Sequence, residues 1–337
     1  MTSRLVCLDL RGAQIRLWKT TPAPAVLCLG NFDGVHLAHA ALLRKGRELT
    51  EAIRGEAAKS SSVLCGVFCF FRPSGDYFLP SNVYPTHLTT LKERLFALRA
   101  LGADLVWLCD FPAVRGLSSQ EFLSLLRDEC GGVGVVCGYN HRFGRGASGS
   151  PAMLKEYFGE DKVAVVPALE IDGAPVSSTR IRTCLLKGDM ETAARLLGRP
   201  YALQGPVLHG KSLGHTWGFP TANQNFPAHR LVPAHGVYAA ICHTPKGMYP
   251  GVANVGLRPT VEAPSRVNCE THIIGFSGDL YGQTITVEFC KFLRPEQKFD
   301  SVDALREAIR RDTEAARVFG EDYLKRNHTE SCDPHFP

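Results

Sequence analysis

The stretch at residues 30–43, GNFDGVHLAHAALL, most limits what this chain can fold into. It follows an apolar run, Ala25–Leu29, that is typical of a buried strand, and it continues as an apolar-periodic segment that predicts a helix. A strand, a glycine turn and a helix start form a site for anions, because the first N–H groups of a helix have no partner within it. The stretch therefore predicts an α/β unit with a phosphate site after this strand.

His36 and His39 lie three residues apart at the start of this predicted helix. Residues three apart share one helix face, so both rings can point at the same bound group. Two imidazoles there can stabilise the charge that develops on an α-phosphate during nucleotidyl transfer. An isolated H-x-x-H more often caps a helix, but the strand–turn–helix context with Gly30, Asp33 and Gly34 favours the phosphate site.

The first half of the chain alternates strand-like and helix-like segments. Its strands are rich in Val, Leu and Phe, which is typical of a parallel sheet buried on both faces. We expect a doubly wound α/β fold, which binds ligands at the carboxyl ends of its strands. The predicted strands are Ala25–Leu29, 63–71, 105–108, 133–137 and Val163–Val166, and the predicted helices lie near 36–53, 90–101, 119–129 and 151–158.

From Tyr201 the pattern changes to short β-rich runs separated by turn residues, which favours a small antiparallel β-barrel. A charged amphipathic segment, 301–319, predicts a C-terminal helix. We therefore expect two domains, 1–186 and 203–330, with a linker region at 187–202. The predicted barrel strands are 207–209, 237–242, 251–255, 267–274 and 284–289.

Two more stretches of the first half carry groups that suit phosphates. Ser178, Thr179 and Arg182 open a predicted helix, although a Ser-Ser-Thr cap before surface arginines is equally common. The glycine-rich basic loop at 138–146, which contains Asn140, follows a predicted strand. It either closes over a nucleotide or is a mobile surface loop, and the sequence leaves both interpretations open.

The second half contains the P-loop spacing G-x-x-x-x-G-K-S at 205–212. A P-loop needs a helix after it, and the next residues, LGHTWGFP, cannot begin one, so we reject that interpretation. Gly210, Lys211 and Gly214 remain candidates for contact with a phosphate in another fold.

Thr221 and Asn223 are two residues apart, so in an extended segment their oxygens face the same side. Such oxygens suit the Mg²⁺ that a nucleotide carries, although a bare P-T-x-N is usually a proline turn. Glu270 shares a face of a strand-like run with His272, and a carboxylate there can act as general base toward a hydroxyl. The alternative is a solvent-facing edge strand.

Composition limits the class of protein. The chain of 337 residues is 45% hydrophobic, and its net charge of +5 suits small anions but is too weak to indicate nucleic acid. The twelve cysteines lack metal-site spacing and several lie in apolar runs, as is typical of a reduced compartment. No apolar run approaches the ~18 residues of a membrane span. We expect a cytoplasmic protein, monomeric or weakly homo-oligomeric, that binds neither nucleic acid nor membrane.

Together these motifs resemble one family, the bacterial bifunctional riboflavin kinase/FMN adenylyltransferases, or prokaryotic FAD synthetases. The likeness covers nearly the whole chain in order. It rests on GNFDGVHLAH, GYNHRFG, VSSTRIR and LLGRPY in the first half, and on HGKSLGHTWGFPTAN, HGVYAA, GVANVGLRPTV, CETHII, DLYG and FLRPEQKF in the second.

The resemblance implies a nucleotidyltransferase-like domain that adenylylates FMN with ATP, and a barrel that phosphorylates riboflavin with ATP and Mg²⁺. Glu270 matches the family's base toward the ribityl hydroxyl, and Thr221 and Asn223 match its ligands of Mg-ATP. His36 and His39 match its ATP-phosphate histidines. Its other nucleotide-binding positions in the first domain are matched by Asn140, Ser178, Thr179 and Arg182.

Three positions depart from the family pattern. Ala38 stands between the two histidines where glycine is usual, and its methyl adds bulk where backbone and phosphate meet. Residues 70–74, FFRPS, lack the histidine of the usual Phe-x-Pro-His-Pro, and His215 follows Gly214 where a basic residue is common. These departures leave an alternative, a riboflavin kinase with a degenerate N-terminal domain. A regulatory protein that binds flavin or nucleotide without turnover is a second one.

Overall fold

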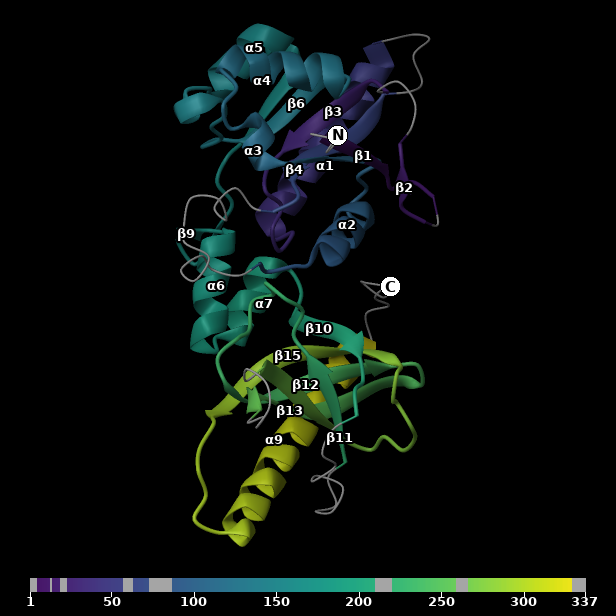
Figure 1. Cartoon of the computed structure of the whole chain (residues 1–337), viewed down its shortest axis with the longest axis vertical. Helices are drawn as coiled ribbons and strands as arrows, with labels where there is room; N and C mark the ends of the chain where they lie inside the picture. Colours follow the sequence, from purple (N-terminus) through teal and green to yellow (C-terminus); the bar gives the residue numbers. More distant parts are fainter. Residues whose placement is uncertain are drawn as a thin grey trace. The chain divides into compact units, whose positions relative to one another are not determined.

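The structure is a computed structural model that describes residues 5–12, 14–18, 23–56, 63–72, 87–209, 220–258 and 266–328. The chain divides into two compact units between Ser178 and Thr179 (Figure 1), and each unit is described by itself. The first is built on a mostly parallel sheet and the second on an antiparallel sheet. The predicted fold class is therefore confirmed.

The first unit contains a seven-stranded sheet in the order β2-β1-β5-β4-β3-β6-β7. Strands β5, β4, β3, β6 and β7 are parallel to one another, as predicted. Strands β1 and β2 add an antiparallel edge that we did not predict. Strand β1 has four apolar residues before Asp9 and β2 has only two residues, so both are too short for a clear strand pattern. The strands are β1 (Leu5–Asp9), β2 (Arg16–Leu17), β3 (Ala25–Leu29), β4 (Leu64–Phe70), β5 (Leu105–Cys109), β6 (Gly132–Gly138) and β7 (Val163–Val166).

Helices cover both faces of this sheet. One face packs against α1 (Leu37–Glu56) and α2 (Leu91–Ala100), and the other against α4 (Ser119–Ser124), its π-helical continuation η2 (Leu125–Glu129) and α5 (Pro151–Phe158). The four predicted helices are confirmed. Smaller elements are α3 (Phe111–Val114), the 3₁₀ turns η3 (Arg145–Ala147) and η4 (Glu160–Lys162), and the hairpin of β8 (Glu170–Ile171) and β9 (Ala174–Pro175).

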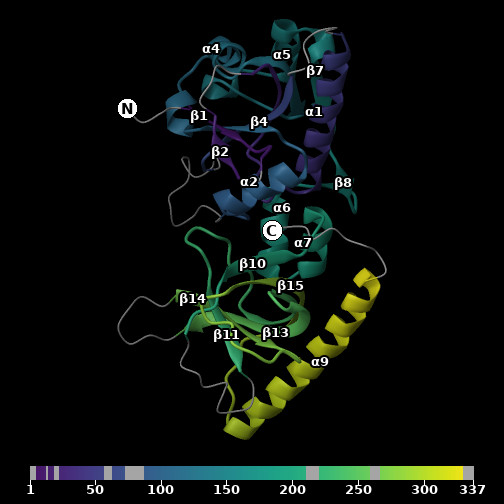
Figure 2. The same ribbon diagram turned by 90° about the vertical axis from the view of Figure 1, so that its right-hand side faces the viewer.

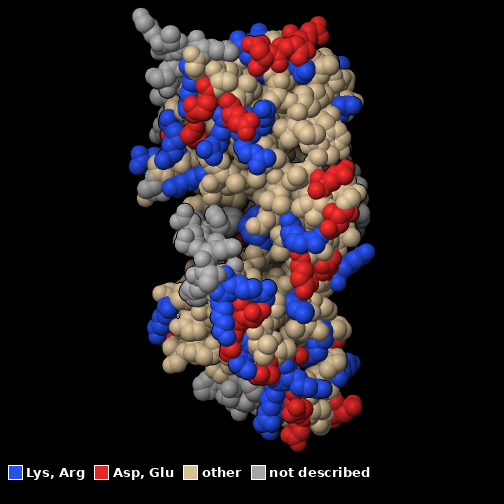
Figure 3. All heavy atoms as spheres, turned by 180° about the vertical axis from the view of Figure 1, so that it is seen from behind, with Lys and Arg blue, Asp and Glu red and all other residues tan. Residues whose placement is uncertain are grey.

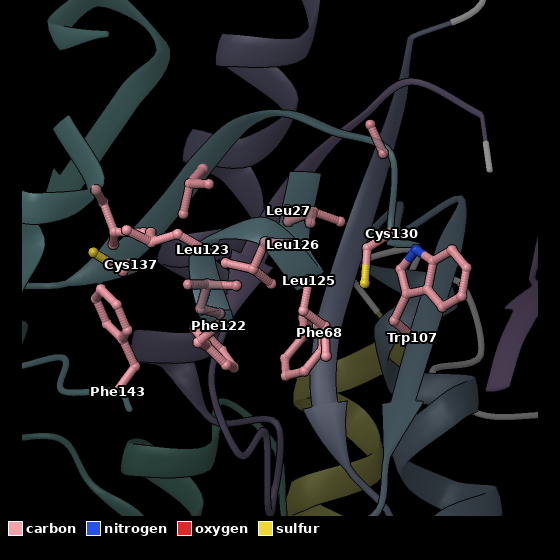
Figure 4. Packing of buried hydrophobic residues seen from close by; sticks show 14 of the residues in the cluster. Leu27, Phe68, Trp107, Phe122, Leu123, Leu125, Leu126, Cys130, Cys137 and Phe143 are labelled. Atoms are coloured by element: carbon pink, nitrogen blue, oxygen red, sulfur yellow. The ribbon is translucent and has the colours of Figure 1, made fainter. Parts of the chain in front are cut away.

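Strand β3 contributes to two hydrophobic cores. Leu27 packs in the core that contains Phe68, Phe122 and Leu126 (Figure 4), whereas Val26 belongs to the core on the opposite face. All five residues of β3 are buried, which explains why this strand is a continuous apolar run rather than an alternating one.

The cysteines of the described residues are free and buried. Burial raises the pKa of the Cys137 thiol to about 11 and the pKa of Cys7 and Cys269 to about 12. These thiols stay protonated at neutral pH and pack as small hydrophobic groups, as the sequence predicts.

The second unit contains a six-stranded antiparallel sheet in the order β10-β15-β12-β13-β14-β11. The helices α6 (Ser178–Lys187) and α7 (Met190–Leu197) precede it, and α9 (Val302–His328) follows it and packs on β12 and β13 (Figure 2). The strands are β10 (Tyr201–Pro206), β11 (Thr221–Asn225), β12 (Gly236–Thr244), β13 (Gly247–Arg258), β14 (Arg266–Ile273) and β15 (Thr284–Pro295).

The edge strands β10 and β11 lie next to each other at a seam between the two edges of the sheet. The N–H of Leu208 donates to the carbonyl of Asn223 at 2.8 Å. Gln224, which is 1% exposed, donates from Nε2 to the carbonyls of Gly205 at 2.8 Å and Ile285 at 3.2 Å. A buried side-chain amide thus joins the strands across a seam where they form no ladder of their own.

Four of the five predicted barrel strands are confirmed within β12 to β15, but the strand at 207–209 is wrong in position. Strand β10 ends at Pro206, and Val207 and Leu208 make only isolated bridges. Proline has no N–H to donate to a ladder, so regular pairing with β15 ends there. The predicted terminal helix is confirmed, and the hydroxyl of Ser301 accepts the N–H of Ala304 at its start.

We predict that Gln224→Ala lowers the free energy of unfolding of the second unit by about 1–3 kcal/mol, because two buried hydrogen bonds across the seam are lost. Gln204→Ala is the matched control, since Gln204 makes one hydrogen bond, at 3.3 Å to Thr286. Its expected cost is below about 1 kcal/mol. Urea unfolding followed by circular dichroism measures both, and equal costs would contradict the role of the seam.

Candidate functional site

The sheet order of the first unit reverses at β3, with β4 on one side and β6 on the other. Doubly wound sheets bind ligands outside the carboxyl ends of the strands at such a reversal. The two segments that the sequence singled out, 30–43 and 138–146, begin at the ends of β3 and β6. The topology therefore places both segments at one edge of the sheet.

His36 and His39 lie at the start of α1, which begins at Leu37. Their rings are stacked, with centroids 3.7 Å apart and planes inclined by 14°. Both side chains are buried, and the ring of Phe32 lies 4.8 Å from that of His39. The sequence predicts from the spacing of the two histidines that both rings lie on one side of the helix start, and the stacked rings agree with this.

The loop that carries these histidines has a strained backbone. Phe32 has φ 51° and Val35 has φ 42°, and both are buried. A left-handed φ at a bulky or β-branched residue costs on the order of 1–3 kcal/mol and persists only where the surroundings enforce it. Asp33 supplies part of that enforcement, since its carboxylate accepts the N–H groups of Leu88 at 3.0 Å and Thr89 at 3.2 Å.

Two more hydrogen bonds hold the same loop. The N–H of Gly34 donates to the hydroxyl of Thr89 at 3.1 Å, and the hydroxyl of Ser178 donates to the carbonyl of Asp33 at 2.9 Å. The predicted second anion site therefore begins beside the loop after β3. Its other members, Thr179 and Arg182, belong to the second unit, and their role stays a prediction.

Arg94 is a residue of this region that the sequence reasoning missed. It is 3% exposed and donates to the carbonyls of Asn31 at 3.2 Å and Phe71 at 2.8 Å, which follow β3 and β4. Its guanidinium therefore ties the ends of two neighbouring strands together beneath the loop. An arginine on the apolar side of the predicted helix 90–101 was the signal that could have found it.

The loop after β6 is held by its own backbone. Phe143 and Gly149 pair in an antiparallel bridge, and the N–H of Gly149 donates to the carbonyl of Phe143 at 2.8 Å. The ring of Phe143 is buried in the core (Figure 4), and a Cβ on Gly149 would clash with it. This argues against a mobile surface loop, and the nucleotide-binding role of Asn140, which is exposed near the start of the loop, stays a prediction.

His141 in this loop stays neutral at physiological pH. Burial, with a smaller contribution from the charge of Arg142, lowers its pKa from 6.5 to about 4. Its ring stacks on Phe143 with a centroid distance of 6.0 Å. The loop therefore carries an uncharged imidazole that packs against Phe143.

This pKa predicts how the stability of the first unit depends on pH. Between pH 6.5 and about 4 the unfolded chain binds a proton at His141 that the folded chain does not, so stability falls as the pH decreases. His141→Phe keeps an aromatic ring beside Phe143 but cannot titrate. Its unfolding free energy, measured in urea at a series of pH values, should depend less on pH than that of the wild type. Equal slopes would contradict this.

In the second unit, polar side chains lie on one face of β14. Asn268, Glu270 and His272 alternate along the strand with Cys269 and Thr271, which are fully buried. Strand β14 lies between β13 and β11, so the interpretation of Glu270 as part of an edge strand is wrong. A carboxylate is thus carried by an interior strand of the barrel sheet.

The strand register gathers the other predicted residues around Glu270. On β11, Asn223 is opposite Glu270 and Thr221 is opposite His272. On β13, Asn254 is opposite Glu270 from the other side. Side chains directly opposite one another have Cβ atoms about 4.5–5.5 Å apart and share a face. Asn254 was missed as a site residue, although its motif GVANVGLRPTV contributed to the family resemblance.

Hydrogen bonds order this polar face. Asn268 donates from Nδ2 to Oε1 of Glu270 at 3.0 Å, and Asn223 donates from Nδ2 to the carbonyl of Thr221 at 3.4 Å. The amide nitrogen of Asn223 is thereby engaged, and the predicted role of its Oδ1 as a metal ligand stays a prediction. The candidate phosphate contacts Gly210, Lys211 and Gly214 lie outside the described residues, as does the departure at His215.

Comparison with known proteins relates both units to flavin biosynthesis. The FAD synthetase family model matches residues 19–180, and the riboflavin kinase family model matches residues 197–319. A bifunctional riboflavin kinase/FMN adenylyltransferase from Pseudomonas fluorescens is 37% identical over 87% of this chain and 92% of its own. The chain belongs to this bifunctional family. The family resemblance inferred from the motifs is therefore confirmed.

Further riboflavin kinase/FMN adenylyltransferases agree with this assignment. The relative from Escherichia coli K12 is 37% identical over 87% of this chain and 92% of its own, and the one from Bacillus subtilis is 32% identical over 90% and 95%. A Streptococcus pneumoniae crystal structure described as a macrolide-efflux protein is 31% identical with a TM-score of 0.78, over 88% of this chain and 95% of that one. Within the described ranges, none of the helices combines the length and apolar character needed to cross a bilayer.

Proposed function

We propose that this protein makes FMN and then FAD. The second domain, residues 203–330, transfers the γ-phosphoryl group of ATP to riboflavin. The first, residues 1–186, transfers AMP from a second ATP to FMN and releases pyrophosphate. The observation that carries the proposal is the polar face of β14. There the strand register sets Glu270 opposite Asn223, and it sets the next residue on that face, His272, opposite Thr221. Both reactions are displacements at phosphorus, so positioning and charge neutralisation do most of the catalytic work.

In the proposed kinase reaction Glu270 is the general base. Its carboxylate accepts the proton of the ribityl 5′-hydroxyl as that oxygen attacks the γ-phosphorus. Thr221 and Asn223 offer a hydroxyl and an amide oxygen on one face, a donor set that fits Mg²⁺ carried by ATP. When bound, Mg²⁺ neutralises charge on the phosphates. Gly210, Lys211 and Gly214 are proposed as further phosphate contacts.

In the proposed adenylyl transfer the stacked pair His36 and His39 stabilises the α-phosphate at the start of α1. The fixed loop around Asp33 supports this role, because it holds the histidines in one geometry before substrate binds. The remaining nucleotide contacts proposed in this domain are Gly30, Asp33, Asn140, Ser178, Thr179 and Arg182.

The proposed setting is the cytoplasm, with the protein as a monomer or weak homo-oligomer. The buried, protonated thiols support a reduced compartment. On the face shown in Figure 3, lysine and arginine are interspersed with aspartate and glutamate over both units. Such mixing supports small anionic substrates rather than an extended nucleic-acid surface.

We predict that Glu270→Gln lowers the rate of FMN formation from riboflavin by 10²-fold or more, because the amide cannot accept the hydroxyl proton. FAD formation from supplied FMN should be unchanged, because that reaction is assigned to the first domain. Glu288→Gln is the matched control, since Glu288 is a second carboxylate of this barrel, 3.1 Å from His243. If Glu270→Gln formed FMN at the wild-type rate, Glu270 would not be the general base.

The alternative of a kinase with a degenerate first domain gains no support. The FAD synthetase family model matches residues 19–180, and the similar relatives carry both names. Ala38, which motivated the alternative, lies in the first turn of α1 and is only partly buried. Alanine has a higher helix propensity than glycine, so it suits the position that Ala38 occupies in α1.

We therefore predict that Ala38→Gly changes the rate of FAD formation by no more than about threefold, with up to ~1 kcal/mol lost from the stability of the first unit through helix propensity. Product separation with FMN and ATP as substrates measures the rate, and thermal unfolding measures the stability. An increase of tenfold or more would mean that the methyl obstructs ATP and would favour the kinase-only alternative.

A further inference from the structure

We infer that Asn268 is a positioning residue for riboflavin phosphorylation, which holds the carboxylate of Glu270 in the orientation that the reaction needs. This inference rests on the proposed role of Glu270 as general base. Asn268 would act through Glu270 and would not itself touch the reacting atoms.

The first observation is the hydrogen bond from Nδ2 of Asn268 to Oε1 of Glu270, at 3.0 Å. The residues are two apart on β14, so their side chains lie on the same face of the strand. A hydrogen bond to an ionised carboxylate is among the stronger kinds, and it restricts a side chain with three rotatable bonds. It engages one carboxylate oxygen, and the second is the one suited to receive a proton.

The second observation is that Asn268 is itself fixed. It is 6% exposed, and it belongs to an interior strand with Asn225 opposite on β11 and Gly256 opposite on β13. Because Asn268 is held by packing, its hydrogen bond can orient Glu270 rather than follow it. Among the described residues, the hydrogen bonds to the Glu270 carboxylate come from Asn268, and the facing Asn223 and Asn254 make none to it.

The third observation explains why an amide suits this position. The place that a Cβ on Gly256 would take is occupied by the carboxylate of Glu296. Gly256 is directly opposite Asn268, so Asn268 has carboxylates nearby along its own strand and across from it. The neutral amide of Asn268 can donate a hydrogen bond to a carboxylate, whereas a carboxylate at position 268 would repel those of Glu270 and Glu296.

The test compares Asn268→Ala with Asn225→Ala, its exposed partner across the β11–β14 pair. We expect Asn268→Ala to lower kcat for riboflavin phosphorylation about tenfold, with the KM values for riboflavin and ATP within about twofold of the wild type. Asn225→Ala should leave all three values unchanged. FAD formation from supplied FMN should be the same in every variant.

Two further variants separate positioning from folding. Asn268→Asp keeps the shape of the side chain and should also lower kcat, because it replaces the donor by a charge that repels Glu270. Asn268→Ser supplies a hydroxyl donor and should recover part of the loss. In the double variant Asn268→Ala/Glu270→Gln, the residual rate should equal that of Glu270→Gln alone, because a residue that acts through Glu270 has nothing left to position.

A wild-type kcat in Asn268→Ala would overturn the inference, and so would a full tenfold additional loss in the double variant. The proposed function has a separate point of failure. If Glu270→Gln phosphorylates riboflavin normally, the role of Glu270 as base is wrong. If Glu270→Gln is inactive while Asn268→Ala has wild-type kcat, only the positioning role of Asn268 is wrong.

Discussion

The carboxylate of Asp33 holds the loop on which the candidate site of the first unit depends. It accepts the backbone N–H groups of Leu88 and Thr89, and this bond network keeps Phe32 and Val35 in left-handed conformations that they would otherwise avoid. The strained turn directly precedes α1 and fixes the position at which this helix begins, where the two histidine rings stack. A buried carboxylate thus converts a glycine-rich sequence into one defined geometry, so little reorganisation remains when substrate binds.

In the barrel, strand register rather than a strained loop fixes the positions of the polar side chains. Alternation along β14 sends Cys269 and Thr271 into the core and places Glu270 on the polar face. The register with β11 then sets Asn223 opposite Glu270 without any special backbone conformation. The two units therefore hold their polar groups by different means.

The parts of the structure that could be predicted are those set by local pattern. The parallel strands were visible as apolar runs, and the placement of His36 and His39 on one side of a helix start follows from their spacing. Contacts between distant segments were not visible. Arg94 lies 63 residues from Asn31 in the chain, and Gln224 lies 61 from Ile285, yet each pair is hydrogen-bonded. The misplaced strand at 207–209 has the same cause, because the end of the ladder at Pro206 depends on its pairing with β15.

The central claim is that one chain carries both flavin reactions, and the product time course of the purified wild-type protein tests it most directly. With riboflavin, ATP and Mg²⁺, chromatographic separation of the flavins should show FMN appearing first and FAD following as FMN accumulates. FMN that accumulates without FAD would contradict the assignment of the first unit. The absence of FMN from the mixture would contradict the assignment of the barrel.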